Sequence, residues 1–137
     1  MGRILAIDYG RKRVGIAVTD PLQLIASPLQ TIDTPKLIPF LVDYVKKEKV
    51  DELVVGFPKK LDNTFTTITQ EVLDFAKKLE LLFSGKKIHL WDERFTSSMA
   101  LQALIQSGVS KKMRKDKAMV DKLSATILLQ SFLEKKQ

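Results

Sequence analysis

The sequence contains no cysteine, a single histidine and few aromatic residues. The absence of cysteine excludes disulfides and thiolate metal sites, and the single histidine, His89, excludes the usual histidine-rich zinc sites and most catalytic triads. Any catalytic chemistry must therefore depend on carboxylates, hydroxyls, lysines or metal ions that prefer oxygen ligands. His89 lies in the apolar segment "KIHLW" with no polar partner nearby in the sequence, so we interpret it as a strand residue.

Long apolar runs are also missing. No segment approaches the roughly 20 residues that a membrane span needs, and the N-terminus lacks the pattern of a signal peptide. We therefore expect a cytoplasmic protein that does not bind membranes. The chain has 137 residues, 45% of them hydrophobic, which fits one folded domain over residues 1–137.

What the sequence does contain is positive charge. Lysine and arginine total 23 against 16 acidic residues, and the resulting formal charge of +7 favours a polyanionic partner such as nucleic acid. The cations cluster in "RKR" (11–13) and "KKMRKDK" (111–117), although either run alone is equally compatible with a solvated surface. The candidate nucleic-acid-binding residues are Arg11, Lys12, Arg13, Lys59, Lys60, Arg94, Lys111, Lys112, Arg114, Lys115 and Lys117.

The order of the predicted elements indicates an α/β fold. Apolar runs predict strands over residues 3–8 and 13–20, joined by a turn in which Gly10 is free to adopt a positive φ, and a third, edge strand over 24–32. The later elements are expected to be a helix over 34–49 with Thr34 as N-cap, a strand over 52–58, a helix over 66–83, a strand over 87–94, a short helix over 95–108 and a closing helix over 118–135. This order builds a mixed five-stranded sheet with helices on both faces, antiparallel at first and parallel later.

Acidic residues follow two of the strands that are expected to be parallel. Asp8 ends the first strand, and Asp92 and Glu93 end the last, so these carboxylates meet at one edge of the sheet if the two strands run in the same direction. Neighbouring strand residues point to opposite faces, and on spacing alone either Asp92 or Glu93 can join Asp8. For Asp8 alone, the structural alternative is a strand-end aspartate that accepts hydrogen bonds from turn N–H groups.

A fourth acid, Asp121, lies in the closing helix among residues that are suited to packing on the sheet. A buried carboxylate needs a compensating cation or metal ion, and the small Ser124 and Ala125 one turn later would let the helix approach the sheet closely. The alternative is a border residue that pairs with Lys117 or Lys122.

Three carboxylates without histidine or cysteine are suitable ligands for a pair of magnesium or manganese ions. Two such ions, about 3.5–4 Å apart, can clamp a phosphodiester between an activated water and the leaving oxygen. In that arrangement Asp8 would be the central, bridging ligand.

Four segments, "AIDYGRKRVGIAVTD", "VVGFPKKLDNT", "WDERFTS" and "VDKLSATILLQ", follow one another over nearly the full length. Together they make the chain resemble the YqgF/RuvX family of Holliday-junction-resolvase-like proteins, which are classed as pre-16S rRNA nucleases. The resemblance implies a ribonuclease H-like (RNase H-like) fold and the processing of precursor 16S rRNA in ribosome biogenesis. The cofactor expected from the three carboxylates, two Mg²⁺ or Mn²⁺ ions, is compatible with that activity. The resemblance further implies that Asp8, Glu93 and Asp121 are the catalytic and metal-binding acids.

The sequence departs from the family pattern at two places. The loop after "GFP" is usually richer in glycine than "KKLDNT", and the small pair in the closing helix is usually two alanines where this chain has Ser124 and Ala125. These departures bear on loop contacts more than on the chemistry.

Two other functions share parts of this pattern. Sugar kinases and actin-like ATPases also open with Asp-x-Gly after a strand, but they close two such domains around a nucleotide and this chain is long enough for one. A non-catalytic RNA- or ribosome-binding module on the same fold fits the composition equally well, although three acids facing phosphate would only weaken its binding. The expected partners are precursor rRNA or branched DNA, together with ribosome-maturation factors, for a monomer or a homodimer.

Overall fold

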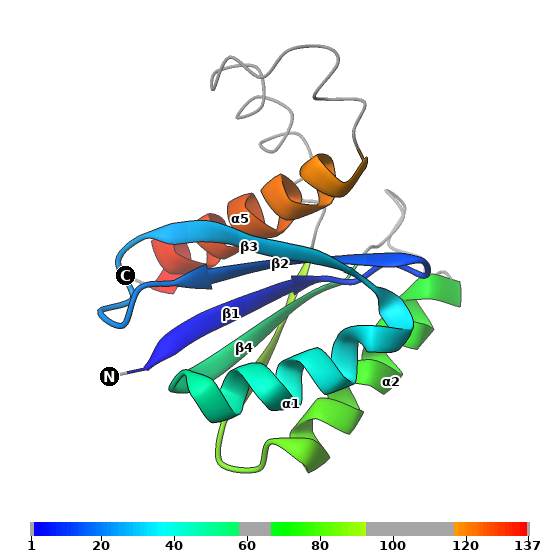
Figure 1. The fold of residues 1–137 in the computed structure, drawn as a ribbon, viewed down its shortest axis with the longest axis horizontal. Coiled ribbons are helices and arrows are strands. Elements are labelled where there is room, and N and C mark those ends of the chain that lie inside the picture. The colour runs from blue at the N-terminus through cyan, green and yellow to red at the C-terminus, as the bar shows by residue number, and fades with distance from the viewer. Residues whose placement is uncertain (1, 58–66, 93–116, 137) are drawn as a thin grey trace.

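The chain forms a five-stranded sheet between two layers of helices (Figure 1). The computed structural model describes residues 2–57, 67–92 and 117–136. The strands are β1 (Arg3–Asp8), β2 (Arg13–Thr19), β3 (Ala26–Asp33), β4 (Val50–Phe57) and β5 (Lys87–Asp92), and the helices are the 3-10 turn η1 (Thr34–Lys36), α1 (Leu37–Lys47), α2 (Thr67–Leu82) and α5 (Lys117–Lys136). The helix expected over residues 95–108 lies outside the described residues.

The sheet has the mixed topology that the sequence predicts. Its strand order is β3-β2-β1-β4-β5. β1 pairs antiparallel with β2, and β2 with β3, whereas β1, β4 and β5 are parallel. Pro28 lies in the edge strand β3 beside an irregularity of that strand: Ile16 pairs with Gln30 and Ala17 with Pro28, so Leu29 has no register partner on β2. A proline is tolerated at an edge because it has no N–H to contribute to a ladder.

Side-chain alternation divides the core between the two faces of the sheet. On β1, Leu5 and Ile7 pack with residues of α1 and α2, whereas Ile4 and Ala6 pack with residues of α5. Figure 1 accordingly shows α1 and α2 on one side of the sheet and α5 on the other. By the same alternation, Asp8 belongs to the face that α5 covers. Within the described part of the chain, no helix is long and apolar enough to cross a membrane.

Helix α5 contacts the sheet through small side chains near its middle. Ala125 is completely buried in one cluster with Ala6 and Ala17, which are register partners on β1 and β2. The expected close approach of the helix at Ala125 is therefore confirmed. Leu128 and Leu129 are also buried, Leu123 and Ile127 are half-buried, and the apolar face continues through Phe132 and Leu133.

The prediction that Thr34 caps α1 is wrong. The chain first makes the turn η1, and Lys36 occupies the N-cap of α1 without a side-chain cap. The Thr34 hydroxyl instead donates a hydrogen bond to the carbonyl oxygen of Gly10 at 2.6 Å, and its N–H donates to the carbonyl oxygen of Lys12 at 3.0 Å. Thr34 thus fastens the β1–β2 turn rather than the helix.

The buried side chain of Glu52 joins three elements at the other end of the sheet. It is 6% exposed on β4, and its Oε1 lies 2.8 Å from His89 Nε2 on β5. Its second oxygen accepts a hydrogen bond from Lys136 Nζ at the C-terminal end of α5. His89 is a strand residue as predicted, but it does have a polar partner. Burial raises the pKa of Glu52, but the hydrogen bonds and charges of Lys136 and His89 outweigh that effect and lower the pKa below its ordinary value.

We expect Glu52→Gln to lower the free energy of unfolding at neutral pH by about 1–3 kcal/mol, because a buried group then loses its charged hydrogen bonds. The partners are 34% and 41% exposed, which places the effect below that of a fully buried pair. A lowered folded pKa stabilises the protein above the ordinary value of 4.5, and this contribution is lost as the pH falls through the folded pKa. Urea unfolding at neutral pH and at about pH 3 should therefore show the difference between the two proteins shrinking in acid.

The matched control is Asp43→Asn, which breaks the exposed pair of Asp43 with Lys47, 3.0 Å apart on α1. It should change the free energy of unfolding by no more than about 0.5 kcal/mol. Equal effects of the two substitutions would mean that the Glu52 contacts do not fasten α5.

Candidate functional site

Asp8 stands at the carboxyl end of β1, between two glycines. Its register partner on β2 is Gly15 and its register partner on β4 is Gly56. Asp8 is half-buried. Because glycine has no side chain, neither neighbour competes for the space beside the carboxylate, and a glycine inside a strand often marks a place where a ligand approaches closely. Gly15 and Gly56 each interrupt an apolar strand, which is the signal in the sequence that could have marked these two positions.

The cationic turn that follows Asp8 has a fixed backbone. Gly10 does not use its freedom to adopt a positive φ. Among the described residues, Gly85 is the glycine that does. Glycine is needed at position 10 for another reason: a Cβ at this position would collide with the carbonyl oxygen of Arg13. With Thr34 bonded to Gly10 and Lys12, the turn presents Arg11 and Lys12 as exposed side chains close to Asp8 in the chain.

Tyr9 anchors the end of β1 to the helical layer. Its ring lies 5.1 Å from that of Phe75 on α2. Burial raises the pKa of the Tyr9 phenol, and the nearby negative charge of Glu71 raises it further. Tyr9 is therefore neutral at physiological pH and has a packing role beside Asp8, not that of a base.

Arg11 has an acidic partner on α2. Its Nε lies 3.5 Å from Glu71 Oε1, and the two side chains are 57% and 41% exposed. An exposed pair of this kind is weak, and a phosphate group can replace the carboxylate as the partner of the guanidinium. Glu71 thus competes with any nucleic acid that binds this turn.

We expect Glu71→Gln to tighten nucleic-acid binding by about two- to fivefold, because the competition for Arg11 is removed. The slope of log affinity against log salt should steepen by up to about 0.9, the value for one additional phosphate contact. The control is Asp43→Asn, which removes the same charge from α1, where the acid pairs with Lys47. If both variants bind nucleic acid more tightly than wild type by the same factor, the gain comes from the change in net charge and not from the release of Arg11.

The structure describes the other predicted site residues to different extents. Asp92 ends β5, and Lys117 and Asp121 lie in the first turns of α5, but their side chains are outside the described part. Arg13 begins β2 and is half-buried. The predicted residues that lie outside the described part altogether are Lys59, Lys60, Glu93, Arg94, Lys111, Lys112, Arg114 and Lys115.

The direction of α5 brings its beginning toward Asp8. The last turn of the helix, at Lys136, contacts Glu52 near the start of β4. The first turns therefore lie toward the carboxyl ends of β1 and β4, where Asp8 is located, as Figure 1 also shows. Within the described residues, no group of three His, Cys, Asp or Glu side chains could hold a metal ion. Of the three predicted ligands, Asp8 is the one whose side chain the structure describes, and its carboxylate is an oxygen donor of the kind that magnesium and manganese prefer.

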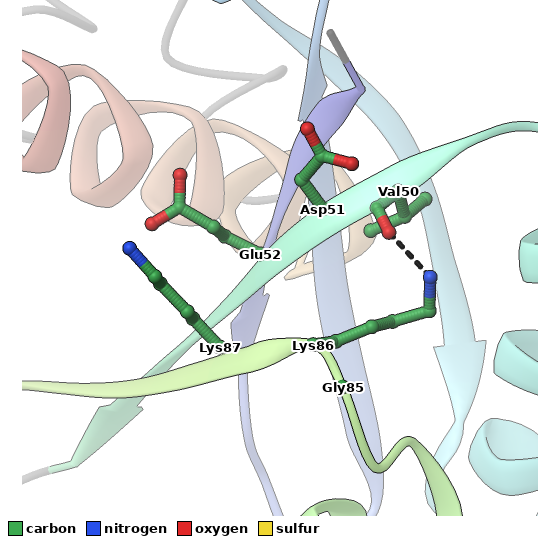
Figure 2. Close-up of a pocket in the computed structure, with 6 residues that line it drawn as sticks. All are labelled: Val50, Asp51, Glu52, Gly85, Lys86 and Lys87. Carbon is green, nitrogen blue, oxygen red and sulfur yellow. Dashed lines mark hydrogen bonds between the residues drawn. The ribbon is translucent and has the colours of Figure 1, made fainter.

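A hollow lies at the opposite end of the sheet. Its lining is shown in Figure 2 and consists of Val50, Asp51, Glu52, Gly85, Lys86 and Lys87. Lys86 Nζ donates a hydrogen bond to the carbonyl oxygen of Val50. Both acidic and cationic residues line the hollow. This mixture of charges does not form an anion site, and the hollow lies far from Asp8.

The chain matches known proteins over nearly its whole length. Residues 2–135 match the family described as "RuvX: Holliday junction resolvase". A protein of Christiangramia forsetii named "Putative pre-16S rRNA nuclease" is 51% identical over 133 residues, which cover 97% of this chain and 98% of that protein. A protein of Phocaeicola vulgatus with the same name is 47% identical over 137 residues, which cover 100% of this chain and 99% of that protein.

Solved structures support the fold. The structure "T. thermophilus RuvC in complex with Holliday junction substrate" matches with a TM-score of 0.62 and 13% identity, covering 99% of this chain and 96% of that chain. A second Thermus thermophilus RuvC structure matches with a TM-score of 0.55, covering 98% and 96%. At this identity the likeness concerns the fold, and it confirms the RNase H-like fold that the sequence predicts. From the family match and the full-length relatives, the chain belongs to the RuvX family.

Proposed function

We propose that this chain is a metal-dependent nuclease that cuts precursor 16S rRNA, the activity for which its relatives are named. One observation carries the proposal: Asp8 ends β1 between Gly15 and Gly56, and a fixed turn with exposed cations follows it. A half-buried carboxylate whose register partners carry no side chain, followed by exposed cations that can bind phosphate, is suited to hydrolysing a phosphodiester. The activity would reside in one domain formed by residues 1–137.

The residues that would hold the metal ions are Asp8, Glu93 and Asp121. The α5 face of β1 carries Asp8, and α5 begins at the same end of the sheet, which supports Asp121 as its partner. His89 and Trp91 of β5 contact Phe132 of α5, so odd-numbered positions of this strand belong to the α5 face. This parity favours Glu93 over Asp92 as the middle acid.

Two bound Mg²⁺ or Mn²⁺ ions would supply charge stabilisation and a nucleophilic hydroxide at neutral pH. The chain's own residues have separate tasks. Arg11 and Lys12 bind the phosphates that flank the scissile bond, and Thr34 holds the turn that carries them. Gly15 and Gly56 place no side chain beside Asp8, where the reacting phosphate would bind.

The experiment that tests the proposal offers two substrates to the same protein, a precursor 16S rRNA transcript and a four-way DNA junction, with Mg²⁺, with Mn²⁺ and after removal of divalent ions. We expect cleavage of the transcript that depends on either ion and resists chelators selective for zinc, since the chain has no cysteine and one histidine. Cleavage of the junction alone would identify a resolvase instead. Tight RNA binding without cleavage under any condition would favour the non-catalytic module.

A further inference from the structure

The loop between β2 and β3, residues 20–25, exposes three large apolar side chains to solvent. Leu22, Leu24 and Ile25 are 63%, 63% and 66% exposed. Single exposed apolar side chains are common on protein surfaces, but three large ones within one six-residue loop are a concentration that is typical of an interaction site. We call residues 20–25 the tip loop.

The tip loop is built to keep this arrangement. One carboxylate oxygen of Asp20 accepts hydrogen bonds from the N–H groups of Leu24 at 2.9 Å and Ile25 at 2.7 Å, and the other accepts from the N–H of Leu22 at 3.1 Å. Gln23 has a φ of 60° and donates from its side-chain amide to the carbonyl oxygen of Gly2 at 2.7 Å. The hydrogen bond from Ile25 is the largest of the effects that lower the pKa of Asp20, so the carboxylate remains ionised and keeps these bonds at neutral pH. The loop is therefore preorganised, and binding through it would lose little conformational entropy.

The tip loop lies away from the candidate active site. Asp8 pairs with Gly15 near the start of β2, and the loop follows Thr19 at the other end of that strand. The part of β2 from Gly15 to Thr19 separates the two by about 13 Å, and the loop extends beyond that end. In Figure 1 the loop projects at the end of the sheet where the chain begins. It can therefore be occupied while Asp8 engages a substrate.

The distribution of charge in the sequence indicates which kind of partner the tip loop can bind. The chain holds 23 lysines and arginines, yet none lies between Arg13 and Lys36. Nucleic-acid binding relies on cations that neutralise phosphates, and this hairpin has two acids, Asp20 and Asp33, in their place. Arg3, whose guanidinium donates to the carbonyl oxygen of Thr19 at the base of the loop, is already paired with Glu48. An apolar loop whose own hairpin carries no cation fits a protein partner better than RNA.

The size and shape of the tip loop argue against a second copy of the chain. Three side chains of this kind present a few hundred Å² of apolar surface, whereas a stable symmetric interface needs roughly 800 Å² from each partner. A projecting loop also does not complement itself across a two-fold axis, because each copy would need a groove to receive it. The occupant is therefore an apolar groove on another protein.

We propose that the tip loop is a docking element that inserts Leu22, Leu24 and Ile25 into an apolar groove on a protein of the precursor small ribosomal subunit. The choice of particle rests on the proposed function. A weak anchor of this size increases binding strongly when the active site holds RNA of the same particle, since the second contact is then intramolecular.

The test compares wild type with the triple variant Leu22→Ser, Leu24→Ser, Ile25→Thr. The control variant is Leu81→Ser, Leu82→Ser, which removes two leucines of α2 that are 85% and 46% exposed. Binding is measured by cosedimentation with purified precursor small-subunit particles from the source cell and with the same rRNA after its proteins are extracted. We expect the triple variant to bind the particle at least tenfold more weakly, to bind protein-free rRNA like wild type, and to unfold at the same temperature. The control variant should bind both like wild type.

Three results would overturn the docking proposal. The first is particle binding that the triple variant retains or that wild type lacks. The second is an equal loss on protein-free rRNA, which would mean that the loop contacts RNA. The third is a wild-type dimer, seen by sedimentation of the free protein, that the triple variant cannot form. Cleavage of protein-free precursor rRNA is recorded separately, so failure of the proposed nuclease activity leaves the binding comparison decisive.

Discussion

Asp8→Asn is expected to lower the rate of RNA cleavage by about a thousandfold or more and to leave RNA binding intact. Asparagine keeps the shape of the side chain, but a neutral amide is a much weaker ligand for a hard cation than a carboxylate. Metal ions contribute several kcal/mol to charge stabilisation in such reactions, and each 1.36 kcal/mol corresponds to a tenfold change in rate. Single-turnover cleavage with saturating enzyme measures this effect without interference from product release.

The control for Asp8→Asn is Asp33→Asn. It removes the same charge from a side chain that is 66% exposed and lies 4.0 Å from Lys36, so cleavage should stay within about twofold of wild type. Thermal unfolding of both variants, with and without magnesium, shows whether the fold is kept and whether the metal still stabilises it. If Asp8→Asn cleaves at the wild-type rate, the carboxylate mechanism is wrong. If it unfolds at a much lower temperature, Asp8 is the strand-end structural residue of the alternative interpretation.

The sheet and its helices were largely predictable from the sequence because their signals are local. Apolar runs bounded by glycine and charged residues predicted β1 and β2. Helical spacing predicted α2, in which Val72, Ala76 and Leu79 are buried. The parallel pairing of β1, β4 and β5 followed from the alternation of strands and helices. The start of α1 was missed because Thr34 has the ordinary features of a cap, while its hydroxyl has a better partner, Gly10, that is distant in sequence.

The site was predictable in part for the same reason. Asp8 was recognised because an acid after an apolar strand is a local pattern. The contacts of Glu52 with His89 and Lys136 could not be found that way, since they join residues separated by 37 and 84 positions and depend on strand register and helix direction. Gly15 and Gly56 acquire their meaning beside Asp8 from register alone. The local sequence pattern therefore identified the carboxylate, and the strand pairing identified the two glycines beside it.

The second large effect is expected from Ala125→Leu, which should destabilise the protein by about 1–3 kcal/mol. Ala125 is completely buried against Ala6 and Ala17, so the helix and the sheet meet there through small side chains. Protein interiors hold few voids, and a leucine at this position forces α5 away from the sheet or forces its neighbours off their preferred rotamers. Denaturant unfolding measures the loss of stability.

The same substitution also tests whether the position of α5 matters for catalysis. Asp121 lies one helical turn before Ala125, so a displacement at Ala125 moves the proposed metal ligand with it. We expect the single-turnover rate per folded molecule to fall at least tenfold, because catalytic groups must be held to within a fraction of an ångström. Leu133→Ala is the matched control: Leu133 is 7% exposed near the other end of α5, and its truncation should cost about 2–4 kcal/mol.

A protein that loses stability at Leu133 without moving Asp121 should keep its rate per folded molecule. Both rates are therefore measured at a temperature where wild type and the two variants are fully folded by circular dichroism. If Ala125→Leu and Leu133→Ala slow cleavage equally, the effect is one of general stability. If Ala125→Leu is destabilised but cleaves at the wild-type rate, the distance between α5 and the sheet does not set the geometry of the site, and Asp121 is then a border residue that pairs with a neighbouring lysine.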